Sequence, residues 1–108
     1  MEYELNGVNL IVHLPGEQDH HSVRTLPQDI ELLFGEYEIR RIIFDFSAVT
    51  FMDSSWIGAV LGRYKRMCER DGDITLYGMN RRTRKLLEMA GVGKLAAMYE
   101  KKEEALKR

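Results

Sequence analysis

Residues 41–77 read RIIFDFSAVTFMDSSWIGAVLGRYKRMCERDGDITLY and predict a strand, a helix and a second strand in succession. The run from Arg41 to Phe46 is almost continuously apolar, which is typical of a strand buried on both faces. A long helix is expected from about Ser54 to Arg70, because apolar residues recur at helical spacing and Asp71-Gly72 ends the pattern. Ile74–Tyr77 forms the next strand. This order is typical of an α/β fold.

The segment before this unit predicts a hairpin followed by a loop. Tyr3–Leu5 and Val8–Leu14 are short strands separated by Asn6-Gly7, and Asn-Gly between apolar runs is a strong hairpin signal. Pro15-Gly16 ends the second strand, and Gly16–His21 is a polar loop. A hairpin joined to later strands of a βαβ pattern gives a mixed sheet.

The next segment has apolar residues at helical spacing but contains a proline. The apolar positions are Val23, Leu26, Ile30, Leu33 and Phe34. Either Ser22 caps this helix and Pro27 kinks it, or Thr25 is the cap and Pro27 lies in the first turn. The spacing of Thr25 and Gln28 matches a capping box and favours the second alternative.

The C-terminal third predicts one more helix and a short strand. Asn80 is a candidate N-cap for a helix that contains Leu86 and Leu87 and ends at Gly91. Lys94–Met98 is a candidate last strand, and Tyr99–Arg108 is a charged, helical tail. The expected fold class is therefore α/β, with a mixed, mostly parallel sheet of four to five strands covered by about four helices.

The composition predicts a single cytoplasmic domain over residues 1–108. Hydrophobic residues make up 44% and charged residues 31%, which provides both a core and a soluble surface. The net charge of -1 gives no basic footprint for nucleic acid. No apolar run is long enough to span a membrane, Met1–Glu4 is unlike a signal peptide, and the single Cys68 cannot form an internal disulfide.

The long helix has two unlike faces when its residues are placed about 100° apart. The expected core face contains Ile57, Val60, Leu61, Tyr64, Met67 and Cys68, which makes Cys68 a buried small hydrophobe. The opposite face contains Ser55, Gly58, Ala59, Gly62 and Arg66. Ser54 lies toward the core side, so Ser55 is the expected exposed hydroxyl. The glycines either let another element of the domain pack closely or form a smooth docking surface.

Ser55 is a candidate phosphorylation site because the start of a helix suits a phosphate. Unpaired backbone N–H groups and the helix dipole favour negative charge there. A phosphate would disturb a partner bound over the same face more than it would disturb the fold. The alternative is that a serine near a helix start is only a cap.

Other chemistries have little support in the sequence. No Gly-x-Ser-x-Gly motif accompanies the serines, and no spacing brings His20 or His21 to them. Adjacent residues on an extended loop point apart, so Asp19, His20 and His21 do not form a metal site. No glycine-rich phosphate loop is present, and the basic run 80–85 is a solvated helix face. We expect no enzyme activity, no cofactor and no metal.

Three motifs resemble those of one known family. They are Asp45-Phe46-Ser47, then Phe51-Met52-Asp53-Ser54-Ser55, and then Ile57-Gly58-Ala59-Val60-Leu61-Gly62-Arg63-Tyr64-Lys65. Together with the loop Gly16–His21 and the order of elements, they resemble the STAS-domain anti-sigma factor antagonists, most closely the sporulation type. The resemblance extends over essentially the whole chain.

The resemblance implies a partner switch. In this family the second serine of Asp-Ser-Ser, here Ser55, is phosphorylated by an anti-sigma factor that is also a serine kinase. The unphosphorylated antagonist binds that anti-sigma factor and releases the sigma factor, and a phosphatase restores the unphosphorylated form. Asp19 matches a partner-binding loop position. The expected partner-binding residues are Asp19, His20, His21, Asp53, Ser54, Ser55, Trp56, Gly58, Ala59, Gly62 and Arg66.

Trp56 departs from the family, which usually has glycine directly after the phosphorylated serine. Its ring is expected at the border of the docking face. It implies a partner with a matching pocket, altered kinase recognition, or a protein that binds without being phosphorylated. The alternative function is a STAS module in another regulatory complex, such as a scaffold or transport-associated subunit, with Ser55 unmodified. A monomer is expected, since the docking face is reserved for a different protein.

Overall fold

A computed structural model describes residues 1–17 and 20–107, without the side chains of His20 and Ser22. It contains five strands, four α-helices and one short 3-10 helix within these residues. In chain order they are β1 (Glu2–Asn6), β2 (Asn9–His13), α1 (His20–Glu36), β3 (Arg41–Asp45), α2 (Ser54–Glu69), β4 (Asp73–Tyr77), α3 (Arg81–Met89), η1 (Val92–Lys94), β5 (Ala97–Tyr99) and α4 (Lys102–Leu106).

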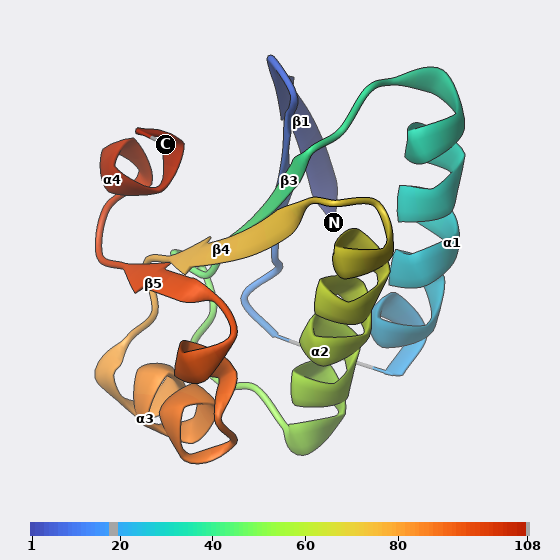
Figure 1. The fold of residues 1–108 in the computed structure, drawn as a ribbon. Helices are drawn as coiled ribbons and strands as arrows, with labels where there is room; N and C mark the ends of the chain where they lie inside the picture. The colour runs from blue at the N-terminus through green and yellow to red at the C-terminus, as the bar shows by residue number, and fades with distance from the viewer. Residues whose placement is uncertain (18–19, 108) are drawn as a thin grey trace.

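The strands form one mixed sheet in the order β1-β2-β3-β4-β5. β1 and β2 are antiparallel, and the other neighbours are parallel, so the predicted α/β class is confirmed. Sequential parallel strands with right-handed crossovers place their connecting helices on one face. Figure 1 shows α1 and α2 on one side of the sheet and α4 alone on the other. The two faces are therefore covered very unequally.

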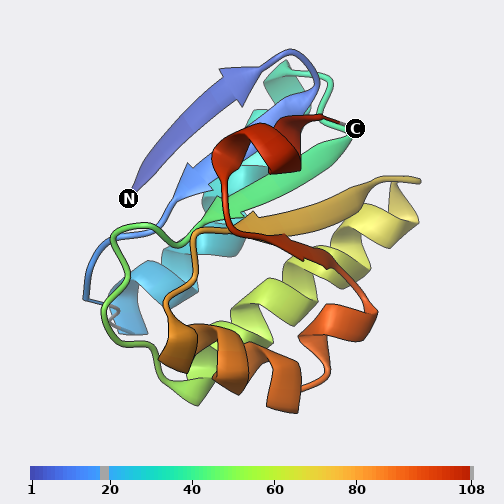
Figure 2. The same ribbon diagram turned by 90° about the vertical axis from the view of Figure 1, so that its left-hand side faces the viewer.

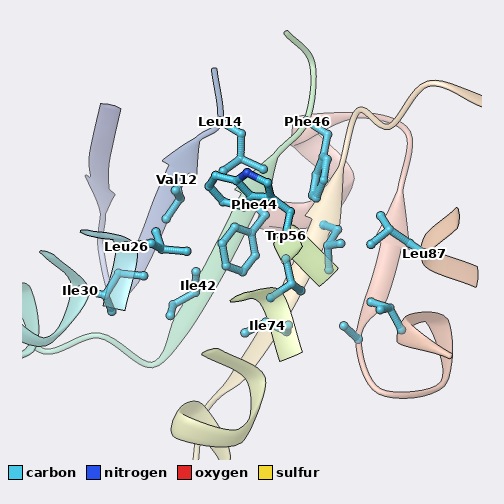
Figure 3. Close-up of a cluster of buried hydrophobic side chains, with 14 of the residues drawn as sticks. Val12, Leu14, Leu26, Ile30, Ile42, Phe44, Phe46, Trp56, Ile74 and Leu87 are labelled. Carbon is cyan, nitrogen blue, oxygen red and sulfur yellow. The ribbon is translucent and has the colours of Figure 1, made fainter. Parts of the chain in front are cut away.

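The larger core lies between the sheet and helices α1, α2 and α3 (Figure 3). Alternate strand residues point into it, because successive side chains of a strand face opposite sides. Its strand members include Leu10, Val12, Ile42, Phe44, Ile74 and Leu76, and its helix members include Leu26, Ile30, Trp56, Val60, Met67 and Leu87. A smaller core of Ile11, Ile43, Tyr77 and Ala105 lies beneath α4 on the other face.

The N-terminal hairpin forms as its turn residues predict. Asn6 pairs with Asn9, and Gly7 has a φ of 62°, a left-handed conformation that glycine adopts without a steric penalty. The turn at the end of α2 also depends on glycine, since a Cβ on Gly72 would lie 2.5 Å from the Arg40 carbonyl oxygen. Both turns therefore fix the register of the strands that follow them.

The start of α1 differs from both sequence-based alternatives. The helix begins at His20, inside the expected polar loop, and Pro27 lies in its interior. Pro27 has no N–H for the Val23 carbonyl, and such a lost bond normally ends or kinks a helix. Leu26 and Ile30 are completely buried against the sheet, and this burial on both sides of the proline holds the helix together. The capping-box prediction at Thr25 is wrong.

The core face of α2 is rotated from the predicted one. Trp56, Val60 and Met67 are its buried residues, whereas Cys68 is exposed. On a helical wheel this moves the centre of the buried face by roughly 60°. The prediction that Cys68 is buried is wrong, because Trp56, the largest side chain of the helix, was assigned to the surface and therefore did not contribute to the expected core face.

The C-terminal elements agree with the prediction except at the last strand. Asn80 caps α3 by accepting a hydrogen bond of 2.8 Å from the Thr83 N–H. The expected strand at Lys94–Met98 is instead the end of η1 followed by β5. The tail contains the short helix α4. Within the described residues, no helix is both long enough and apolar enough to cross a membrane.

Candidate functional site at the start of helix α2

Three loops meet at the carboxyl ends of the parallel strands (Figure 2). Glu17, after β2, forms an isolated parallel bridge with Phe51, in the connector between β3 and α2. The Thr50 N–H donates to the Gly16 carbonyl at 3.2 Å. From the other side, the Asn80 amide nitrogen donates to the Val49 carbonyl at 3.1 Å. The connector that leads into α2 is therefore fixed by contacts with the loop before α1 and with the start of α3.

Asp53 caps α2 and holds the Ser55 hydroxyl. Its Oδ1 accepts a hydrogen bond of 2.9 Å from the Ser55 N–H and a short hydrogen bond from Ser55 Oγ. The first bond satisfies one of the unpaired N–H groups of the helix start. The alternative that Ser55 is the cap is wrong, because Asp53 has that role. Ser55 Oγ is instead a hydroxyl whose proton points at a carboxylate.

The two serines differ in exposure, and the order is the reverse of the expected one. Ser54 is exposed, whereas Ser55 is half-buried. The same rotation of α2 that buries Trp56 turns Ser54 to the outside and Ser55 to the edge of the helix face. Ser55 is nonetheless the serine whose hydroxyl is positioned by Asp53.

The glycine face of α2 is open. Gly58 and Gly62 are exposed, and a Cβ built on either residue would meet nothing within 4 Å. The alternative that these glycines allow another part of the described chain to pack closely is therefore wrong. Ala59 is half-buried and packs against the edge of the larger core. Ser55, Gly58 and Gly62 thus form a narrow, smooth strip of helix surface, which we call the glycine strip.

Trp56 lies inside the protein instead of at the border of the docking face. Its side chain is 0% exposed and belongs to the larger core (Figure 3). The prediction that Trp56 contacts a partner is wrong, and so is the reading of its ring as an anchor for a partner's pocket. Its Nε1 has no hydrogen-bond partner among the described residues. Counting Trp56 with Val60 and Met67 on the wheel would have found the correct core face.

Arg66, another expected partner-binding residue, already contacts α1. Its guanidinium bonds Glu31 through Nε at 2.8 Å and through a terminal nitrogen at 3.1 Å. The same group lies 5.5 Å from the centre of the Phe34 ring. The hydrogen bond from Arg66 lowers the pKa of the Glu31 carboxyl. Arg66 thus joins α1 to α2, beside the strip but turned toward its own fold.

The loop residues are only partly described. His21 is exposed in the first turn of α1. Asp19 lies outside the described residues, and the side chain of His20 is not described. No group of three His, Cys, Asp or Glu residues able to hold a metal ion occurs in the part of the chain that the structure describes.

A polar cluster on the other face of the sheet was missed by sequence reasoning. His13 contacts Asp45 through Nδ1 at 2.6 Å and Glu4 through Nε2 at 2.8 Å. The Ser47 hydroxyl donates a hydrogen bond to Asp45 Oδ1, and the Nζ of Lys102 in α4 lies 3.6 Å from Glu4 Oε2. The sequence signal for this cluster is one polar residue on each of β1, β2 and β3. The register of the sheet brings these residues to the same face.

The charged groups of this His13 cluster raise the pKa of the histidine and lower the pKa values of the two carboxyl groups. Burial lowers the pKa of His13, but the hydrogen bonds and charges of Glu4 and Asp45 outweigh burial and raise it. The hydrogen bond from His13 lowers the pKa of Glu4. Burial raises the pKa of Asp45, but hydrogen bonds from Ser47, His13 and Tyr77 outweigh it and lower the pKa. Because both ring nitrogens face carboxylates, the protonated imidazole is the favoured form.

The fold and the site together define a family. The model of the family described as "STAS domain" matches residues 1–105 of the chain. The chain therefore belongs to the STAS domain family, as its motifs predicted.

Within that family the chain is similar to antagonists of anti-sigma factors. It is 32% identical to the anti-sigma F factor antagonist of Paenibacillus polymyxa over 90% of this chain and 83% of that protein. The solved structure of the unphosphorylated anti-sigma factor antagonist SpoIIAA matches with a TM-score of 0.87 at 30% identity, over 99% of this chain and 93% of that chain. The phosphorylated form of SpoIIAA, a Bacillus cell fate determinant, matches with a TM-score of 0.80 at 30% identity, over 99% and 96% of the two chains.

Proposed function

We propose that this protein is an anti-sigma factor antagonist whose partner is an anti-sigma factor with serine kinase activity. The observation that carries the proposal is the Ser55 hydroxyl, held by Asp53 at the start of α2 beside the open glycine strip. The similarity to SpoIIAA, which is known in unphosphorylated and phosphorylated forms, supports the same assignment. We propose that the protein binds this partner in the cytoplasm. We also propose that the protein is a monomer when it does so.

The unphosphorylated site suits close docking. Exposed glycines let a partner backbone approach α2 without meeting side chains, and Ser55 is the polar group at one end of the strip. An anti-sigma factor that binds this surface cannot use the same contacts for its sigma factor, which is thereby released. Binding here requires no rearrangement of the fold, since the strip is already open.

Phosphorylation would change the charge of this surface. The Ser55 Oγ–P bond forms, the bond between the γ-phosphorus of ATP and the β,γ-bridging oxygen breaks with release of ADP, and the hydroxyl proton passes to solvent. The phosphate carries about -1.5 to -2 charges at neutral pH. It stands next to the Asp53 carboxylate, which loses its hydrogen bond from Ser55 Oγ and gains a like-charged neighbour. Partner binding is then opposed by charge and by bulk, until a phosphatase hydrolyses the Oγ–P bond and restores the hydroxyl.

A second candidate function is a STAS module in another regulatory complex, such as a scaffold or a transport-associated subunit, with Ser55 unmodified. Ser55 is half-buried, which favours a site that binds without being phosphorylated. The surface used for binding is the same strip in both cases.

The two functions are separated by a phosphorylation assay. The protein is incubated with ATP and the anti-sigma kinase of the same genome, and the modified residue is mapped by mass spectrometry. We expect phosphate on Ser55, none on Ser55→Ala, and unchanged phosphorylation of the exposed neighbour variant Ser54→Ala. Absence of phosphate from Ser55 after incubation with ATP and the kinase would favour the second function, in which Ser55 stays unmodified.

A further inference from the structure

A shallow groove lies between the connector and helix α3, next to the start of α2. Its volume is about 290 Å³, and it is open to solvent. The lining residues are Phe51, Met52, Arg82, Thr83, Lys85, Leu86 and Met89. We refer to these residues as the α3 groove. None of the residues that form the proposed glycine strip belongs to it.

The surface of the groove is mostly apolar. The Phe51 ring is 57% exposed and the Met89 side chain 77% exposed, although both are large and hydrophobic. Met52 is buried at the base, and Leu86 is half-buried. Scattered apolar side chains are normal on a protein surface, but several around one concave site indicate a contact with another molecule. Methionine also adapts its shape to different partners.

The rim of the groove is positively charged. Arg82 and Lys85 line it, and no acidic residue does among those that the structure describes. On the same helix Arg84 lies 3.8 Å from Glu88, whereas neither Arg82 nor Lys85 is in an ion pair within the described part of the chain. Residues 82, 85, 86 and 89 share one face of α3 because they are three or four positions apart. An occupant with acidic groups beside an apolar group would complement this face.

The groove lies close to the Ser55 site along the chain. Four Cα–Cα steps separate Phe51 from Ser55, so the two Cα atoms are at most about 15 Å apart. The Asn80 amide holds the connector against the start of α3, which fixes the groove relative to α2. A protein that contacts Ser55 therefore has to extend by at most about 15 Å to reach Phe51, which is exposed.

We propose that the α3 groove binds an acidic amphipathic segment of the anti-sigma factor. A bulky apolar side chain of that segment lies between Phe51 and Met89, and its acidic side chains pair with Arg82 and Lys85. This inference rests on the proposed function and adds a second contact to the Ser55 surface. The cationic rim selects partners by charge, while the apolar groove supplies the anchor.

The test is calorimetric titration of the cognate anti-sigma factor with variants of the full chain. We expect Phe51→Ala and Met89→Ala each to weaken binding about tenfold, as loss of an apolar anchor does. The matched control is Leu32→Ala, because Leu32 on α1 is 72% exposed, close to the exposure of Met89. We expect Arg82→Glu and Lys85→Glu to weaken binding and reduce its salt dependence, whereas Lys107→Glu, directly after α4, leaves both unchanged. Circular dichroism confirms that each variant is folded.

The outcomes separate this inference from the proposed function. Unchanged affinity in Met89→Ala and Phe51→Ala, with binding still lost in Ser55→Asp, would overturn the groove and leave the function standing. A wild-type protein that does not bind the anti-sigma factor at all would overturn both. Size-exclusion chromatography with light scattering tests whether a second copy of this chain occupies the groove instead. A wild-type dimer that becomes a monomer in Met89→Ala would assign the groove to a second copy of this chain and contradict the proposal.

Discussion

Two surfaces of the molecule differ in how their residues are partnered within the chain: the His13 cluster on one face of the sheet, and the glycine strip of α2 over the other face. On the face covered by α4, His13 bonds both Glu4 and Asp45, and Ser47 donates a further hydrogen bond to Asp45. On the face covered by α2, the outer surface of the helix has two glycines at which an added Cβ would meet no other residue within 4 Å. The first arrangement contributes to stability and the second leaves room for a partner. The His13 cluster and the glycine strip both consist of polar or small residues. Residue type alone therefore does not tell a stabilising cluster from a docking surface.

Replacement of the buried tryptophan has the largest expected effect on this contrast. Trp56→Gly should lower the free energy of unfolding by about 5 kcal/mol, since it removes a fully buried aromatic side chain and adds a helical glycine. Chemical denaturation measures this. Trp56→Phe is the control, because it keeps most of the packing and removes the unpaired Nε1. Equal stability of wild type and Trp56→Gly would contradict the assignment of Trp56 to the core.

Replacement of a strip glycine should have a smaller effect of opposite sign. Gly58→Ala should raise the free energy of unfolding by up to about 1 kcal/mol, because alanine favours the helix and its Cβ meets no neighbour. The same variant should weaken binding of the anti-sigma factor, because the methyl group stands where the partner backbone approaches. Gly35→Ala on α1 is the control for binding, since its Cβ is equally free of contacts. A variant that is more stable and binds as tightly as wild type would show that the strip is not the docking surface.

The smallest expected effect is a pH dependence in the His13 cluster. Because the pKa of His13 is raised above 6.5, its contribution to stability is complete below that pH and is lost as pH rises through the raised value. Because the pKa values of Glu4 and Asp45 are lowered, their contributions are complete above 4.5 and 3.8 and are lost as pH falls through the lowered values.

Denaturation of wild type and His13→Gln at several pH values checks this expectation. The stability difference between them should be greatest between pH 4.5 and 6.5 and should decrease above that range. His21→Gln is the control, because His21 is exposed on α1. A difference that is constant across the whole range would show that His13 is not a charged member of the cluster.

Much of the fold was predictable from local signals. The Asn6-Gly7 turn, the apolar run of β3 and the Asn80 cap each depend on a few adjacent residues, and all three form as expected. The start of α1 was not predictable in this way. A proline inside a helix is tolerated there because Leu26 and Ile30 pack on the sheet, which is a tertiary effect.

The candidate site was predictable as a region but not in its details. The motif selected the start of α2, yet the wheel placed Trp56 outside and Cys68 inside, and both assignments were wrong. A helical wheel gives the angles between side chains but not which side of the helix faces the sheet. Assigning one large residue to the wrong side therefore shifts the predicted core face of the whole helix. The role of Asp53 as the cap and partner of Ser55 required the connector geometry.

The most direct test of the phosphorylation switch is the affinity of three forms of the protein for the cognate anti-sigma factor. Calorimetry compares wild type, enzymatically phosphorylated wild type and Ser55→Asp, with Ser54→Asp as the control for added charge on the exposed neighbour. The switch predicts tight binding of unmodified wild type, loss of binding on phosphorylation and in Ser55→Asp, and a smaller effect in Ser54→Asp. Equal affinity of unmodified and Ser55-phosphorylated protein would contradict it.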